Sequence, residues 1–146
     1  MKNISLQTVL DTPSDAAKNL PFYPLLPKDE VSLLRFRIYV LARCNTDEEF
    51  RRDIWSMCCK DVVFFAAIFC WLHETRDDAF TKVVGKFPFI PWTDQVDLLA
   101  WLQEYGGKSD MTIEKTRGIG LSWVVIVFLM WKWLTYGEHL DFGIIS

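Results

Sequence analysis

The chain has 146 residues, of which 51% are hydrophobic and 15% aromatic, so it can bury a core and is not a disordered segment. Its 16 basic and 19 acidic side chains leave a net charge of -3, so net charge gives no argument for nucleic-acid binding. The four cysteines contain no C-x-x-C pair, and we expect reduced core thiols rather than a zinc site.

Residues 1–27 predict an extended N-terminal arm. The run NLPFYPLLP ends this segment, and its prolines disfavour a helix while its apolar residues favour contact with a surface. Two interpretations stay open. The arm either contacts a neighbouring subunit or docks loosely on its own chain.

Residues 28–107 predict a helical region. The first helix spans residues 28–43, with Arg35, Arg37 and Arg43 expected on a solvated face. A second helix is expected to begin at Thr46, which forms a capping box with Glu49. A third helix, apolar on nearly all sides, is predicted from residue 61 to about residue 74, with Asp61 as its cap.

A further helix is predicted over residues 94–105. Two prolines in KFPFIPW favour an extended path before it, and the Gly106-Gly107 pair ends it. Gln95 lies in its first turn, either as an exposed helix residue or as a ligand-binding carboxamide. Trp92 and Pro91 either flank a bound ring or belong to the core.

Two apolar runs, residues 62–72 and 121–131, are each about half of the roughly 20 residues that a membrane span needs. We therefore expect both to be core helices and expect no contact with a membrane.

Residues 108–146 predict the start of an α/β fold. Residues 111–114 read as a strand, a glycine loop follows, a helix runs from near Ser122 to about residue 133, and residues 141–145 read as a second strand. A strand, helix and strand in this order form a βαβ unit. The sequence therefore predicts the start of a parallel sheet in an α/β fold.

The loop before that helix is a candidate anion site, because a helix N-terminus presents backbone N–H groups and the positive end of the helix dipole. Against the pattern G-x-x-x-x-G-K-[ST], Ser122 and Gly120 match. Leu121 replaces the usual lysine, and Lys115 stands at the first position, from which its ammonium can reach phosphates. Arg117 adds a second cation.

The run IEKTRGIGLSW resembles the Walker A segment of tailed-phage large terminases, the ATPases that pump viral DNA into capsids. Part of that family carries the lysine first, as K-[ST]-R-x-x-G-x-[ST]-W. Upstream, MCCKDVVFFAAIFCWLHETR and FPFIPWTDQVDLL resemble the family's aromatic helix and its adenine-recognising motif, and downstream DFGIIS resembles its next strand. The matching loop positions are Lys115, Thr116, Arg117, Gly120, Ser122 and Trp123.

The resemblance implies that the expected sheet is the start of a P-loop NTPase parallel sheet, truncated at the end of the chain, and it implies roles for individual residues. Lys115 and Arg117 would act in catalysis, Ser122 would ligate Mg²⁺, and Gln95 would read the adenine of ATP. The complete protein would act on double-stranded DNA with a portal and a small terminase subunit, as a homo-oligomeric ring in the cytoplasm of an infected bacterial host. The implied phosphate-binding loop positions are Thr116, Gly118, Ile119, Gly120, Leu121 and Ser122.

No apolar strand ending in an acidic pair follows Ser122, and the family's nuclease domain has no counterpart. We therefore expect an N-terminal fragment that binds nucleotide weakly and does not hydrolyse it. Two alternatives remain: a stand-alone helical interaction protein without catalysis, and a different P-loop ATPase such as a helicase-like protein.

Overall fold

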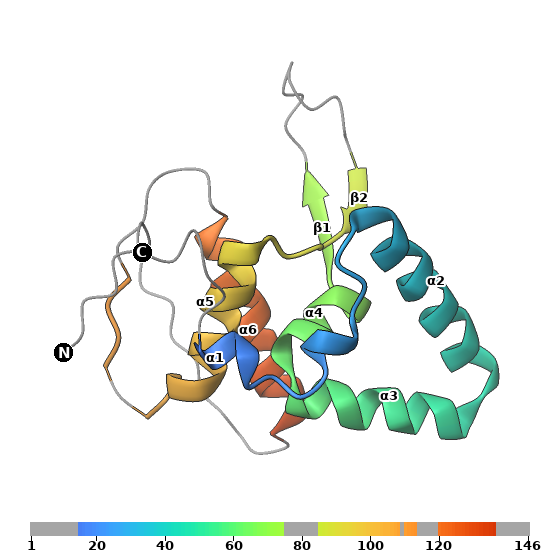
Figure 1. Cartoon of the computed structure of the whole chain (residues 1–146), viewed down its shortest axis with the longest axis horizontal. Helices are drawn as coiled ribbons and strands as arrows, with labels where there is room; N and C mark the ends of the chain where they lie inside the picture. Colours follow the sequence, from blue (N-terminus) through green and yellow to red (C-terminus); the bar gives the residue numbers. More distant parts are fainter. Residues whose placement is uncertain (1–14, 75–84, 109, 114–119, 137–146) are drawn as a thin grey trace.

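The structure, a computed structural model, describes residues 15–74, 85–108, 110–113 and 120–136. Within these ranges the chain is mostly helical, with one pair of short strands (Figure 1). A 3-10 turn at Tyr23–Leu25 precedes the first long helix. The elements in order are α1 (Asp15–Lys18), α2 (Glu30–Thr46), α3 (Glu48–Lys60), α4 (Val62–Phe69), β1 (Trp71–Glu74), β2 (Gly85–Pro88), α5 (Thr93–Tyr105) and α6 (Leu121–Thr135).

Three aspartates set the starts of α2, α3 and α4. The carboxylates of Asp29, Asp47 and Asp61 each accept the backbone N–H three residues further on, at 2.9–3.0 Å. A carboxylate in this position satisfies one of the free N–H groups of the first helical turn. The prediction of an Asp61 cap is confirmed. The prediction that Thr46 caps the second helix is wrong, since Thr46 is the last residue of α2 and Asp47 is the cap.

Helix α4 is the centre of the core. It contacts α2 and α3 on one side and α5 and α6 on the other (Figure 1). Its sequence VVFFAAIF is apolar on every face, and residues 62–68 are all buried. A helix of this composition is stable only when other elements cover it on all sides. The predicted helix over residues 61–74 was therefore right in type, although it ends at Phe69 and a strand follows.

Arg37 reaches from α2 into this core, which corrects the prediction of a solvated face. Its side chain is only 2% exposed. One guanidinium nitrogen, Nη1, donates to the carbonyl oxygen of Ala67 at 3.1 Å, and the guanidinium carbon lies 4.5 Å from the ring centroid of Trp71. The aliphatic part of an arginine side chain can pack along an apolar surface, so the helical pattern of polar residues alone does not show that an arginine is exposed.

The predicted α/β fold is contradicted. The sheet among the described residues is a two-stranded antiparallel pair, in which β1 and β2 align Trp71 with Pro88 and Glu74 with Gly85. Residues 111–113 form no strand, and residues 141–145 lie outside the described ranges. Alternation over three or four residues does not identify a strand, because a strand needs a partner edge for its backbone groups. The fold of the described residues is a helical body with one hairpin at its edge.

Helices α5 and α6 match the predictions closely. Helix α5 ends at Tyr105, and Gly107 behind it has a φ of 81°, a left-handed conformation that glycine adopts without strain. Helix α6 begins at Leu121, one residue before the predicted start, and packs against both α5 and α4. Both helices pack against α4 and against each other, and α5 also packs against α1. Their buried apolar residues are Val96, Leu98, Leu99, Ala100 and Leu102 in α5, and Val124, Val127, Phe128 and Trp131 in α6.

Candidate functional site

Two of the predicted site residues, Gln95 and Gly120, lie against each other. Gly120 precedes α6 with a φ of 65° and a ψ of 30°, a left-handed conformation that favours glycine. A Cβ atom added to Gly120 would lie 3.0 Å from the Nε2 atom of Gln95. The side-by-side packing of α5 and α6 therefore brings the first turn of one helix to the N-terminus of the other.

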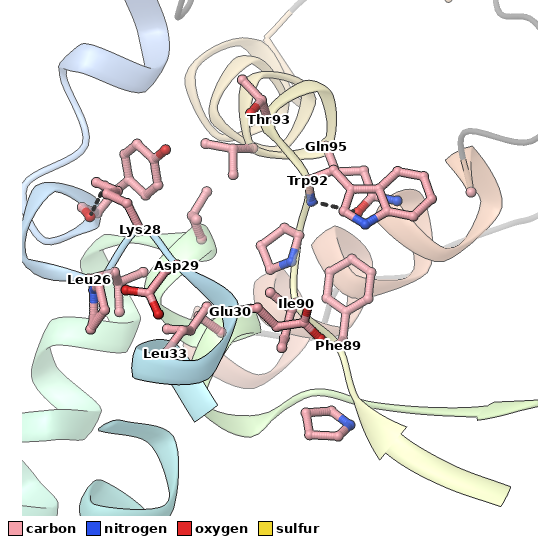
Figure 2. Close-up of a pocket in the computed structure, with 18 of the residues that line it drawn as sticks. Leu26, Lys28, Asp29, Glu30, Leu33, Phe89, Ile90, Trp92, Thr93 and Gln95 are labelled. Atoms are coloured by element: carbon pink, nitrogen blue, oxygen red, sulfur yellow. Dashed lines mark hydrogen bonds between the residues drawn. The ribbon is translucent and has the colours of Figure 1, made fainter. Parts of the chain in front are cut away.

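Gln95 is buried rather than exposed, and its side chain is held in place. Its Oε1 atom accepts the backbone N–H of Trp92 at 3.0 Å, which caps the N-terminus of α5 (Figure 2). This hydrogen bond fixes the orientation of the Gln95 amide group.

Gln95 and Gly120 line a cavity of about 730 Å³, a size suited to a small organic ligand. Figure 2 shows the cavity with Trp92 and Gln95 on one side and Lys28 and Asp29 on the other. Its remaining walls come from the N-terminal part of the chain, α4, β1 and the segment after β2. The lining also includes Tyr23, Leu26, Pro27, Glu30, Pro91 and Trp123.

The described lining carries little positive charge. Lys28 is the one basic residue in it, and its Nζ atom donates to the carbonyl oxygen of Tyr23 at 3.1 Å and lies 3.6 Å from that ring's centroid. Burial lowers the pKa of Lys28, and the Asp61 carboxylate opposes that shift. Asp29 and Glu30 lie beside it. An acidic, aromatic wall of this kind suits an uncharged ring better than a phosphate.

Apart from Gly120, which lines the cavity, the loop residues expected to hold phosphates divide into two groups. Lys115, Thr116, Arg117, Gly118 and Ile119 lie outside the described residues. Leu121 and Ser122 form the first turn of α6, where Ser122 is exposed and Leu121 is half-buried, and neither lines the cavity.

The carbonyl of Gly120 accepts the N–H groups of Trp123 and Val124, which begins the helix. The N–H groups before these point out of the N-terminus, as in any helix.

The sequence did not identify the N-terminal wall of the cavity. Residues 1–27 were expected to be an arm against a neighbouring subunit or a loosely docked tail, and residues from 28 on were expected to be helical. Instead Leu20 and Leu26 are buried in the core, and the segment from Tyr23 to Glu30 forms one side of the cavity. The apolar residues between the prolines of NLPFYPLLP indicated that this segment packs on a surface, but their spacing does not identify which surface.

Across the described ranges no group of three or more His, Cys, Asp or Glu side chains is placed to hold a metal ion. None of the helices in those ranges combines the length and apolar character that crossing a membrane requires. No protein family, curated protein or solved structure matches the chain.

Proposed function

We propose that this chain is the N-terminal, ATP-binding part of a viral large terminase, the motor that packages DNA into capsids. The observation that carries the proposal is the contact between Gln95 and Gly120 at the edge of a ligand-sized cavity. The resemblance put these residues in two separate motifs, one for adenine and one for phosphate. An ATP site requires both motifs to meet in space.

The charges of the cavity suggest how ATP lies in it. The base would occupy the cavity, with the Gln95 carboxamide at its edge, because the described lining is aromatic, apolar and mildly acidic. The phosphates would lie toward the N-terminus of α6, where the helix dipole favours anions. Lys115 and Arg117 would hold them, with backbone N–H groups of the loop, and Ser122 would ligate Mg²⁺.

The remaining parts of the proposal concern the complete protein. Double-stranded DNA, a portal and a small terminase subunit would be its partners, and a ring of subunits would act in the cytoplasm of an infected bacterium. Hydrolysis needs acidic groups that position Mg²⁺ and the attacking water, and the sequence shows none after Ser122 in the required setting. We therefore expect binding without turnover from this chain.

The test is binding of MgATP, measured by titration calorimetry and by the ligand-dependent shift of the melting temperature. Lys115→Ala removes the phosphate-binding cation and should raise the Kd about tenfold or more. Lys108→Ala is the matched control, because Lys108 is exposed and outside the cavity. Gln95→Glu keeps the oxygen that caps α5 but removes the amide donor, so it should weaken ATP binding without unfolding the helix. Equal affinity in all four proteins, or no binding at all, would refute the ATP site.

Nucleotide binding does not distinguish a terminase from a helicase-like ATPase. Sequencing the DNA beyond the codon for Ser146 does. An apolar strand ending in acidic residues, followed by a distant acidic nuclease cluster, supports the terminase. A reading frame with helicase motifs in place of the nuclease contradicts it.

A second candidate function is that of a helical interaction protein. Helix α6 exposes large apolar side chains at three- and four-residue spacing along one stripe: Trp123, Ile126, Met130, Trp133 and Leu134. Such a stripe is typical of a helix that packs against a further element or partner. This function predicts no response to MgATP and none to Lys115→Ala, so the same titration separates the two candidates.

A further inference from the structure

A single buried carboxylate joins the N-terminal segment to the central helix. Asp61 is fully buried, and its Oδ1 atom accepts the backbone N–H of Phe64 at 2.9 Å, which caps α4. Its Oδ2 atom accepts two more backbone N–H groups, from Phe22 at 3.0 Å and Tyr23 at 2.7 Å. Hydrogen bonds to an ionised acceptor are about twice as strong as those between neutral groups. One side chain therefore fixes two segments that are far apart in the sequence.

The segment held by Asp61 is the wall of the cavity that faces Gln95. The wall begins at Tyr23, the residue with the shorter of the two bonds, and continues through Leu26 to Glu30. The ring of Phe22 packs edge-on against that of Phe64, with centroids 6.0 Å apart, beside the carboxylate. Asp61 itself does not line the cavity. It acts on the cavity only through the backbone that it holds.

We propose that Asp61 is a positioning residue for the base end of the ligand site. It keeps residues 23–30 closed over the cavity, so that a purine ring is enclosed between this wall and the Pro91–Gln95 segment. We call the two hydrogen bonds from Phe22 and Tyr23 to Asp61 Oδ2 the clamp. Without the clamp the cavity becomes an open groove, in which the purine ring makes fewer contacts and is more exposed to water. The phosphate end, at the N-terminus of α6, is built from other residues and is unaffected. This inference rests on the proposed ATP site and assigns it a residue that touches no ligand.

The test compares variants that keep the helix cap but lose the clamp. Serine and asparagine cap helices about as well as aspartate. The single short hydroxyl of Asp61→Ser can cap α4 but cannot also reach Phe22 and Tyr23. Asp61→Asn places an amide NH₂ where Oδ2 accepts two N–H groups. The matched control is Asp47→Ser, because Asp47 caps α3 in the same way, with Phe50 as donor, and its other partner is Arg43 on α2 rather than the described part of the N-terminal segment. That exposed ion pair contributes little to stability.

Two readouts separate positioning from general stability. The first is hydrogen exchange of the Phe22 and Tyr23 amides in the ligand-free chain, which should become about tenfold faster or more in both Asp61 variants and remain unchanged in Asp47→Ser. The second is the ratio of the Kd for MgATP to that for inorganic tripolyphosphate. Loss of the base wall should raise the Kd for MgATP by about fivefold or more and leave that for tripolyphosphate unchanged.

Each outcome bears on a different claim. If the two amides exchange no faster, Asp61 is not the clamp. If they exchange faster while the Kd for MgATP stays the same, the wall is not part of the site. If both ligands weaken together, Asp61 has only a general structural role. These three results overturn the inference and leave the ATP site standing. If the unsubstituted chain binds neither ligand, the proposed function fails and the inference fails with it.

Discussion

The indole Nε1 of Trp131 donates a hydrogen bond to the carbonyl oxygen of Cys58 at 2.7 Å. Both residues are buried, and the bond joins α6 to the last turn of α3. That carbonyl also accepts the N–H of Asp61, at 3.4 Å, at the turn into α4. Trp131 thus supports the turn that presents the Asp61 carboxylate.

Trp131→Phe should lower the free energy of unfolding by about 1–2 kcal/mol, because the buried carbonyl of Cys58 loses its shorter hydrogen bond. Urea unfolding followed by far-ultraviolet circular dichroism measures this change without relying on tryptophan fluorescence. Trp133→Phe is the control, since Trp133 lies on the same helix and is 61% exposed. Equal destabilisation by the two substitutions would show that the hydrogen bond contributes nothing specific.

Gly120→Ala should destabilise the chain for two separable reasons. The left-handed backbone costs a residue with a Cβ about 1–2 kcal/mol, and the new methyl would meet Gln95 Nε2 at 3.0 Å. A double-mutant cycle with Gln95→Ala separates them, because only the second cost disappears when the amide is gone. A coupling energy of zero, measured by urea unfolding, would mean that the methyl group introduced at position 120 does not clash with the Gln95 amide.

Arg37 is a buried cation whose Nε and Nη2 atoms have no hydrogen-bond partner among the residues that the structure describes, and burial lowers its pKa. Arg37→Met keeps much of the volume and removes the cost of burying the charge. It should therefore be neutral or raise stability by about 1–4 kcal/mol. Arg37→Ala leaves a cavity and should lower stability by about 2–5 kcal/mol. The urea midpoints of the two variants decide this. A Met variant as unstable as the Ala variant would show that the charge itself is needed.

The four thiols should differ in reactivity. Burial raises the pKa of each, that of Cys70 to about 12 and that of Cys58 further still. Cys59 is only half-buried, and the neighbouring Lys60 partly opposes its shift. Because the thiolate is the reactive form, a disulfide reagent at pH 8 should modify one thiol quickly and the others only with unfolding. Cys59→Ser should abolish the fast phase. A fast phase that survives in this variant would contradict the assignment.

Some features of the fold are determined by residues that are close together in the sequence. The apolar run of α4, the glycines after α5 and the start of α6 were predicted correctly, because each depends on residues within one or two turns. The capping of α4 by Asp61 was predicted for the same reason. The cap of α3 was displaced by one residue, since Thr46 and Asp47 are both competent caps and the choice depends on how α2 ends.

The α/β prediction failed at Met111–Ile113. A pattern of alternating residues is compatible with a strand, but only a partner edge makes it one, and the described part of the chain provides none there. The hairpin of β1 and β2 formed instead where the sequence had suggested a helix end and an extended path. Pairing between segments separated by a loop is not encoded in the periodicity of either segment.

By itself, the sequence determined that the segments of α2 to α6 are helical, where α5 stops, and which loop resembles a phosphate-binding motif. Only the tertiary structure decided that Gln95 meets Gly120, that Arg37 is buried, and that Asp61 holds the N-terminal segment against the cavity. The reason is physical. Helix formation and capping depend on neighbours along the chain, whereas a cavity and its walls depend on how whole helices pack around α4, and that packing is a compromise among all of their apolar faces at once.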